Sequence, residues 1–286
     1  MKNGRYSIGE ISKLCCIPVS KLRYYDEQGV IKPCFVDGES GYRYYDNETL
    51  LLISVLKYYQ ACGFKLKEIE ELLQRMDIDH LESLFTRQID ALEQHIRTLQ
   101  IQRDSIATWR ALIEEERRAM AQPDCPVQHR YYERAAMYVS KPYTWDGMLY
   151  ESLVANIELC NHLTNNGNST VGPLYLFFPG GNRRQFCDAK IYIRPHPQET
   201  PMTEQEELGG FNALCTYHKG SFETGEEAYE RLFAYSARHN IPLQGDSFER
   251  SVIDWWSTKK EEEFLLEIIL PTAQAPAPGA LPHAAL

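Results

Sequence analysis

A heptad pattern between positions 85 and 113 is the strongest constraint on how this 286-residue chain can fold. Two sets of positions recur every seven residues, separated by alternating steps of four and three, as in a coiled-coil seam. The sets are Phe85, Leu92, Leu99, Ile106 and Ile113, and Ile89, Ile96, Arg103 and Arg110. The intervening positions Arg87, Asp90, Glu93, Gln94 and Arg97 are polar for more than three turns, which favours a dimerisation helix over a helix packed on its own domain. We expect a helix over 78–120 that is on the order of 60 Å long.

The segment before this helix has the signals of a helix-turn-helix. Ser7 and Glu10 have capping-box spacing, so a helix should start after Ser7. A second helix, which begins at Val19 beyond a proline-stiffened turn, should end at Gly29. Its outward face carries Ser20, Lys21, Arg23 and Tyr24. An Asp-Gly turn at 37–38 between apolar runs predicts a hairpin wing.

Arginine and tyrosine recur on both parts of this segment, in Leu22-Arg23-Tyr24-Tyr25-Asp26 and Gly41-Tyr42-Arg43-Tyr44-Tyr45-Asp46. These side chains offer planar donors, positive charge and flat faces, which suit a DNA backbone. A buried tyrosine ladder is the alternative. The chain carries a net charge of -10, but residues 1–77 hold 11 Lys and Arg against 11 Asp and Glu. A local basic patch can therefore bind phosphate while the remainder stays acidic.

These motifs resemble the MerR family of transcription regulators. The matching residues are Tyr6-Ser7-Ile8-Gly9-Glu10, Leu22 to Asp26, Lys32-Pro33, Gly41 to Tyr45 and Gly63-Phe64. The resemblance implies a winged helix-turn-helix domain over 1–77 and antiparallel pairing of the long helix in a homodimer. It also implies double-stranded promoter DNA and RNA polymerase holoenzyme as partners, with activation by promoter distortion. The DNA contacts it implies, together with Ser20 from the outward face, are Ser20, Lys21, Arg23, Tyr24, Tyr25, Tyr42 and Arg43.

Beyond residue 127 the pattern changes to alternating strands and helices, which predicts an α+β domain with a pseudo-repeat over 127–270. The expected strands are 130–139, 174–178, 189–193, 211–218 and 264–270, and the expected helices are 146–163 and 226–239. Residues 271–286 are rich in proline and alanine and predict a disordered tail. The fold class is therefore α+β multidomain.

This half resembles the GyrI-like effector-binding domain, and it is similar to the multidrug-sensing branch of MerR regulators. The matching stretches are Tyr217 to Phe222, Glu226 to Tyr229, Asp246 to Glu249 and Trp256 to Phe264. The resemblance implies a small lipophilic cation or aromatic ligand, with Glu249 as its carboxylate partner. A delocalised cation needs aromatic walls and a carboxylate in a partly dry site. The candidate effector residues are Glu249, Trp255, Trp256, Glu262, Phe264, Tyr175, Phe177 and Tyr192.

Two other functions remain open at this point. Some GyrI-like domains resemble hydrolases, in which Glu249 would act as a general base. The eight cysteines include no C-x-x-C pair, so a redox or metal sensor built on Cys125 lacks cysteine partners. We expect no enzyme activity, no cofactor and no metal. With no run of about twenty apolar residues and no apolar signal core near the N-terminus, we expect a cytoplasmic protein without a membrane partner.

Overall fold

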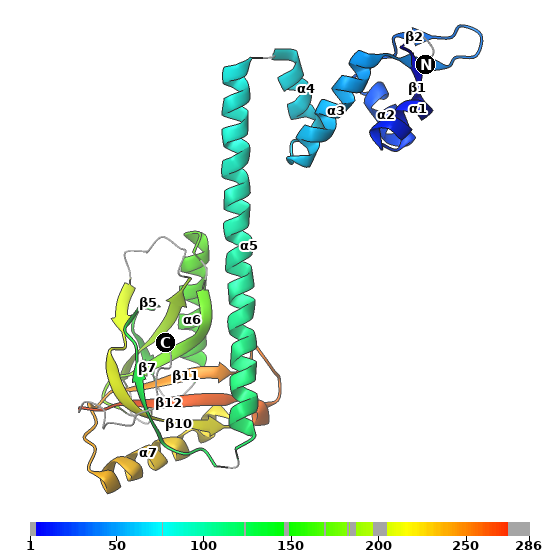
Figure 1. The fold of residues 1–286 in the computed structure, drawn as a ribbon. Helices are drawn as coiled ribbons and strands as arrows, with labels where there is room; N and C mark the ends of the chain where they lie inside the picture. Colours follow the sequence, from blue (N-terminus) through cyan, green and yellow to red (C-terminus); the bar gives the residue numbers. More distant parts are fainter. Residues whose placement is uncertain are drawn as a thin grey trace. The chain divides into compact units, whose positions relative to one another are not determined.

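The computed structural model describes residues 4–75, 77–122, 124–145, 149–168, 170–181, 183, 187–196 and 205–273. The contacts divide the chain into two compact units, residues 1–96 and 97–286, with the boundary inside one long helix. Each unit has its own hydrophobic core. Figure 1 shows the helices and strands of both units.

The first unit is a helix-turn-helix with a small sheet. Its elements are β1 (Tyr6–Ser7), α1 (Ile8–Cys15), α2 (Val19–Glu27), β2 (Phe35–Val36), β3 (Arg43–Tyr45), α3 (Asn47–Ala61) and α4 (Leu66–Arg75). The predicted capping box is present: Ser7 accepts from the Glu10 backbone N–H, and the Glu10 side chain accepts from the Ser7 N–H. Gly29, with φ +73°, follows α2 in a left-handed conformation that glycine adopts without strain. The strands pair antiparallel in the order β1-β3-β2, which confirms the predicted wing hairpin.

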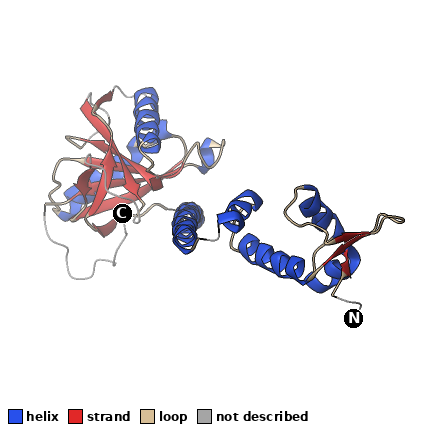
Figure 2. Cartoon of the chain, turned by 90° about the horizontal axis from the view of Figure 1, so that it is seen from above, coloured by secondary structure: helices blue, strands red, loops and turns tan. Residues whose placement is uncertain are grey.

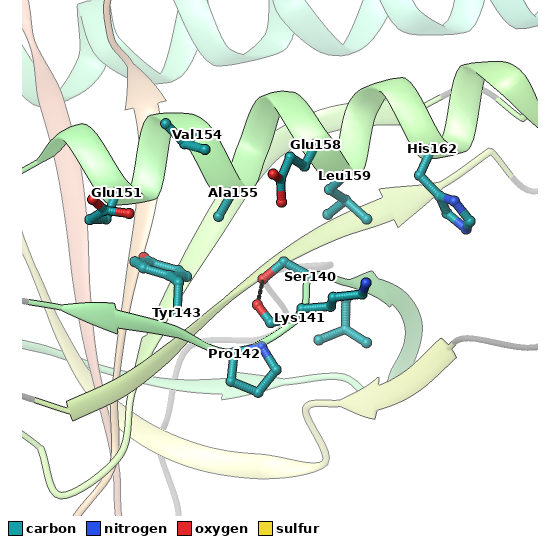
Figure 3. A pocket seen from close by; sticks show the side chains of 11 residues that line it. Ser140, Lys141, Pro142, Tyr143, Glu151, Val154, Ala155, Glu158, Leu159 and His162 are labelled. Atoms are coloured by element: carbon teal, nitrogen blue, oxygen red, sulfur yellow. Dashed lines mark hydrogen bonds between the residues drawn. The ribbon is translucent and has the colours of Figure 1, made fainter.

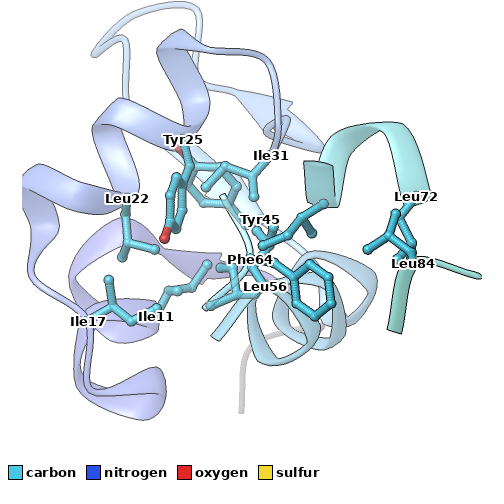
Figure 4. Packing of buried hydrophobic residues seen from close by; sticks show 12 residues of the cluster. Ile11, Ile17, Leu22, Tyr25, Ile31, Tyr45, Leu56, Phe64, Leu72 and Leu84 are labelled. Atoms are coloured by element: carbon cyan, nitrogen blue, oxygen red, sulfur yellow. The ribbon is translucent and has the colours of Figure 1, made fainter. Parts of the chain in front are cut away.

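The helix-turn-helix and its wing, residues 4–75, are called the reading head below. The core of this unit packs the helices of the reading head together (Figure 4). Leu22 of α2, Ile11 of α1 and Leu56 of α3 are each 1% exposed or less. Leu84 joins this core, and Phe85 packs against it with its ring 5.9 Å from those of Tyr59 and Phe64. The start of the long helix therefore packs on the reading head.

The long helix α5 runs from Ile78 to Met120, a length of 43 residues, and confirms the helix expected from the heptads. Its later part belongs to the second unit, where Trp109, Leu112 and Ala119 pack against Val252 and Leu265.

The second unit contains two strand–helix–strand–strand repeats. Its elements are β4 (Gln128–Tyr132), β5 (Ala135–Val139), β6 (Tyr143–Trp145), α6 (Leu149–Asn165), β7 (Thr170–Phe178), β8 (Cys187–Pro195), β9 (Gln205–Leu208), β10 (Phe211–Lys219), η1 (Phe222–Thr224), α7 (Glu226–His239), β11 (Ser247–Ile253), η2 (Glu261–Glu263) and β12 (Leu265–Pro271). β5, α6, β7 and β8 form one repeat, and β10, α7, β11 and β12 form the other. β7 pairs with β11 where the repeats meet.

The strands of this unit form one curled antiparallel sheet. Among the described residues the strand order is β4-β10-β12-β11-β7-β8-β5-β9, with β6 pairing β8. β9 and β10 lie near opposite ends of this order, yet only Gly209 and Gly210 connect them. The sheet must therefore curl so that its ends approach each other, as its curvature in Figure 2 illustrates.

Both helices of the repeats cover the same face of the sheet. Ala155 and Leu159 of α6 pack on Leu176 and Ile191, while Leu232 of α7 packs among the residues of β10 and β12. Directly paired residues of neighbouring antiparallel strands share a face. Because Glu249 pairs with Leu176 and Ile268, it also lies on this helix-covered face.

Three details differ from the sequence expectations. The strand expected over 130–139 is two strands, β4 and β5, which pair with β10 and with β8 and β9 respectively. The short strands β6 and β9 were not predicted. The disordered tail was expected to begin at residue 271, but Pro271 is the last residue of β12 and Thr272 forms a bridge with Leu243. Residues 146–148, at the expected start of the first helix, and 274–286, the rest of the expected tail, lie outside the described residues.

Candidate functional site

The outward face of α2 presents the predicted DNA-reading residues. Ser20, Lys21, Arg23 and Tyr24 are all exposed. The Lys21 Nζ donates to Gln60 Oε1 at 2.8 Å and lies 5.7 Å from the centre of the Tyr25 ring, so this cation is held in place. Within the described part of the chain, Arg23 has no hydrogen-bond or ion-pair partner. It is therefore free to contact an anion.

Tyr25, for which the family resemblance implied a DNA contact, does not lie on this surface. Its side chain is 1% exposed and points into the core beside Leu22 (Figure 4). Its hydroxyl donates to Gln60 Oε1 at 2.8 Å. The helical period explains the difference, because residue 25 lies three positions after Leu22 on the buried face of α2. The buried-tyrosine reading therefore holds for Tyr25 and for Tyr45, which is also buried, but not for the exposed Tyr24.

The wing places Tyr42 and Arg43 at the surface, and Tyr42 is 64% exposed. Arg43 forms an ion pair with Asp26 of α2, whose side chain is only 8% exposed. The Tyr45 hydroxyl also donates to Asp26, at 3.3 Å. Burial, followed by the Asp26 charge, raises the pKa of Tyr45 to about 12. Asp26 therefore connects α2 to the hairpin through Arg43 and Tyr45.

The heptad residues of α5 form an exposed apolar stripe in this single chain. The exposed members are Ile89, Leu92, Ile96, Leu99, Ile106 and Ile113, at 41–69%. Phe85 is not part of the free stripe, because it packs into the reading-head core. A run of large apolar side chains left in water along one helix edge is typical of an interface.

An apolar cavity of about 440 Å³ opens on the helix-covered face of the sheet in the second unit. Leu174, Leu176 and Ile191 form its floor, and α6 and the loop after β11 form its walls. The other lining residues are Tyr150, Ser152, Leu153, Asn156, Phe222, Ser251, Asp254, Trp255 and Trp256. Tyr150, Trp255 and Trp256 are each more than half exposed, so the rim is aromatic. This size and lining are typical of a small-molecule site.

A second cavity, of about 550 Å³, lies against the opposite face of α6 (Figure 3). Glu151, Glu158 and His162 project from the helix towards Lys141 and Tyr143. The lining therefore includes both acidic and basic groups. The Ser140 hydroxyl in this lining donates to the Lys141 carbonyl and accepts from the Ile191 N–H, so it has a structural role.

Glu249 is buried next to the apolar cavity but does not line it. Its side chain is 1% exposed, and Arg183 Nη1 lies 3.4 Å from each carboxylate oxygen. The Tyr229 hydroxyl donates to Oε1 at 3.0 Å. Arg183 is itself only 8% exposed and lies 5.5 Å from the Trp145 ring centre. The carboxylate expected to meet a ligand is already neutralised by an arginine of the same chain.

The other candidate effector residues divide between several places. Trp255 and Trp256 line the cavity. Phe264 is fully buried beneath Trp255, with ring centres 4.8 Å apart, and Glu262 is exposed on η2. The structure places the remaining three on the opposite face of the sheet, because they alternate with the cavity residues along their strands; they are Tyr175, Phe177 and Tyr192. Sequence reasoning could not place them without the strand register.

Asp254, Tyr150, Leu153 and Arg183 are among the residues at or near the cavity that the sequence analysis missed. An acid directly before two tryptophans was the one available signal for Asp254. Arg183 gave none, because it meets Glu249 across 66 residues of sequence.

A buried ion network on the opposite sheet face connects the sheet to α5. Glu267 accepts from Arg130 Nη1 at 2.6 Å, from Arg250 Nε at 2.6 Å and from the Tyr132 hydroxyl at 2.9 Å. Arg250 also pairs with Glu115 of α5. Glu249 and Arg250 are neighbours on β11, so their side chains lie on opposite faces of the sheet. Glu249 lies on the helix-covered face, and Arg250 contacts α5.

No cluster of three or more His, Cys, Asp or Glu suited to a metal ion occurs in the described ranges. Nor does any helix within those ranges have the length and apolarity needed to cross a bilayer.

Comparison with known proteins agrees with the two-unit architecture. Residues 6–76 match the MerR HTH family of regulatory proteins, residues 52–109 match the MerR DNA-binding family, and residues 133–273 match the GyrI-like small molecule binding domain. The multidrug-efflux transporter 1 regulator of Bacillus subtilis is 24% identical and aligns over 96% of this chain and all of its own. The transporter 2 regulator of the same organism is 28% identical over 93% of this chain and 95% of its own.

Among solved structures, an EcmrR–DNA complex with RNA polymerase aligns over 94% of this chain and all of that chain, with 18% identity and a TM-score of 0.43. The family matches cover the reading head, the following helix and the cavity domain in order. The chain therefore belongs to the MerR family of DNA-binding transcription regulators, and its second unit is a GyrI-like small-molecule-binding domain.

Proposed function

We propose that the protein is a homodimeric transcription regulator that responds to a lipophilic cation or aromatic molecule bound in the apolar cavity. In this proposal α2 and the wing bind promoter DNA, and α5 pairs with α5 of a second copy. Ligand binding then alters the bound promoter so that RNA polymerase holoenzyme can use it. The domains would be the reading head over 1–77, the dimer helix over 78–120 and the effector domain over 127–270.

The observation that carries this proposal is the aromatic-rimmed cavity in a chain that also presents a DNA-reading surface. Its floor is apolar and its rim has three exposed aromatic side chains, Tyr150, Trp255 and Trp256. Aromatic faces attract cations as well as apolar molecules. The similarity to two multidrug-efflux regulators over nearly the whole chain supports the same class of ligand.

The direct test measures binding and transcription together. Tetraphenylphosphonium should quench the intrinsic tryptophan fluorescence of the full-length protein, because Trp255 and Trp256 line the cavity. Trp256→Ala should weaken this binding by about tenfold, the loss expected for one cation–π contact of about 1–2 kcal/mol. The cation should also change transcription by purified RNA polymerase from a promoter bound by the protein. A cation that neither binds nor alters transcription would refute the ligand class.

The dimer assignment has its own test. Leu92→Glu combined with Leu99→Glu should convert the protein to monomers, because four charges would meet in a dry seam of the dimer. Light scattering coupled to gel filtration would measure the mass. The matched control replaces Gln94 and Gln100 with glutamate, which adds the same charge at positions outside the heptad sets and should leave the dimer intact. If the leucine double variant stays dimeric, these residues do not form the interface.

The hydrolase alternative depended on Glu249 as a general base. Both oxygens of that carboxylate lie next to Arg183, and one of them also accepts from Tyr229. The curated relatives described above are regulators. Both facts favour ligand binding over turnover.

A further inference from the structure

The apolar cavity contains a carboxylate that has no counter-charge among the residues that the structure describes. Asp254 lines this cavity just after β11, and it is 7% exposed. Across the residues that the structure describes, no Lys, Arg or His lies within ion-pair distance of its carboxylate. This distinguishes Asp254 from Glu249, which Arg183 already neutralises.

The local backbone holds Asp254 in place. Its Oδ1 accepts from the Trp256 N–H at 3.0 Å, and its main-chain carbonyl accepts from the N–H groups of Ser257 and Thr258 at 2.9 and 3.1 Å. The carboxylate and the two tryptophans are therefore parts of one turn. Fixing the acid in advance reduces the ordering cost when a ligand binds.

The charge of the Asp254 carboxylate is only weakly stabilised by the described residues around it. Burial raises the pKa of its carboxyl, and the single hydrogen bond from the Trp256 N–H opposes that shift only in part. A charge that is buried without a cation costs free energy, and a cationic ligand would remove that cost. A neutral ligand of the same shape would leave it in place.

We infer that Asp254, rather than Glu249, makes this cavity selective for cationic over neutral ligands. The inference rests on the proposed ligand-sensing function. Asp254 supplies the charge, and Tyr150, Trp255 and Trp256 supply the aromatic faces beside it. The ligand class is an organic cation of delocalised charge with aromatic groups, because a compact, strongly hydrated cation would lose too much water in an apolar cavity.

The second cavity shows why this arrangement is selective. There Glu151 and Glu158 share the lining with Lys141 and His162, so opposite charges are already present. Among the described residues, the lining of the apolar cavity includes one carboxylate and no basic side chain. Charge selection is therefore expected in the apolar cavity alone.

The experiment compares two probes that share aryl groups but differ in charge, tetraphenylphosphonium and neutral triphenylphosphine oxide. Isothermal titration calorimetry on the full-length protein measures both affinities. Asp254→Asn keeps the acceptor for the Trp256 N–H but removes the charge. We expect it to weaken cation binding by about 10- to 100-fold, as for an ion pair in a partly buried site, and to change binding of the neutral probe by less than about threefold.

Glu227→Gln is the charge-matched control, because Glu227 is exposed on α7 and does not line the cavity. It should leave both affinities unchanged, which excludes a long-range effect of net charge. If Asp254→Asn does not fold, Asp254→Glu keeps the charge and should retain the preference for the cation. Thermal melts would verify folding of each variant.

The possible results separate this inference from the proposed function. If the wild type binds the cation and Asp254→Asn binds it equally well, the inference is wrong and the ligand-sensing function stands. A selective loss in Glu249→Gln with none in Asp254→Asn would return the role to Glu249. If the wild type binds neither probe, both the inference and the proposed ligand class are wrong.

Discussion

Glu267→Gln should lower the free energy of unfolding of the second unit by about 3–5 kcal/mol, the usual cost of breaking a buried ion pair from one side. Glu267 is 1% exposed and is shared by Arg130 and Arg250. Glutamine keeps the size of the side chain but removes the charge. Arg250 would keep Glu115 as a partner, whereas Arg130 would lose its carboxylate. Urea unfolding followed by circular dichroism measures the change.

The dependence of the free energy of unfolding on pH should also change in Glu267→Gln, at acidic pH. Burial acts to raise the pKa of Glu267, but Arg250 and Arg130 outweigh it, so the folded-state pKa lies below the ordinary value of 4.5. A depressed folded pKa contributes stability that is fully present above about pH 4.5 and is lost as the pH falls through the lower, folded value. Wild type should therefore lose stability below about pH 4.5, and this portion of the loss should be absent in Glu267→Gln.

Glu263→Gln is the control for this prediction. Glu263 also pairs with a basic side chain, Lys260, but that lysine is 66% exposed and Glu263 is 43% exposed. Removing a solvent-screened pair should leave the unfolding curve close to that of wild type. Equal curves for Glu267→Gln and wild type would show that the buried network contributes no net stability.

Arg23→Ala should weaken DNA binding by roughly 10- to 100-fold, equivalent to about 1–3 kcal/mol. Arg23 is an exposed cation on the outward face of α2. Within the described residues it forms no hydrogen bond or ion pair that would have to break when it binds DNA. If it contacts a phosphate, the slope of log affinity against log salt should fall by about 0.9. Fluorescence anisotropy over a salt series, with a duplex selected from a random pool, measures both quantities.

Two variants control this measurement. Arg238→Ala removes an exposed arginine from α7 in the second unit, and it should leave affinity and salt slope unchanged. Tyr25→Phe removes the hydroxyl that bonds Gln60, so it should reduce stability by about 1 kcal/mol but leave the salt slope intact. A salt slope that is the same in wild type and Arg23→Ala would mean that Arg23 makes no phosphate contact.

Local sequence signals predicted most of the elements. The capping box at Ser7 and the glycine after α2 act between neighbouring residues, so they can be read without the rest of the chain. The heptads predicted α5 because helical periodicity is also a local property. The bounds expected for α7, residues 226–239, agree with the structure for the same reason.

Pairing between distant strands could not be read in this way. Glu133 and Arg134 interrupt what looked like one strand, and only the partners of β4 and β5 show that the halves belong to different parts of the sheet. Tyr175 and Phe177 have aromatic side chains that suit a ligand cavity. The register of β7 places them on the opposite face from Leu174 and Leu176, which form the cavity floor.

The sequence by itself determined the family, the helix-turn-helix and the heptad stripe of α5, because motif spacing and helical period are local. Only the tertiary structure decided which acid faces the cavity. Glu249 is chemically suited to hold a cation, but Arg183 reaches it across the fold and neutralises it. Asp254 lies five residues later and has no such partner in the described chain. Counter-charges are set by distance in space, and distance along the sequence does not reveal them.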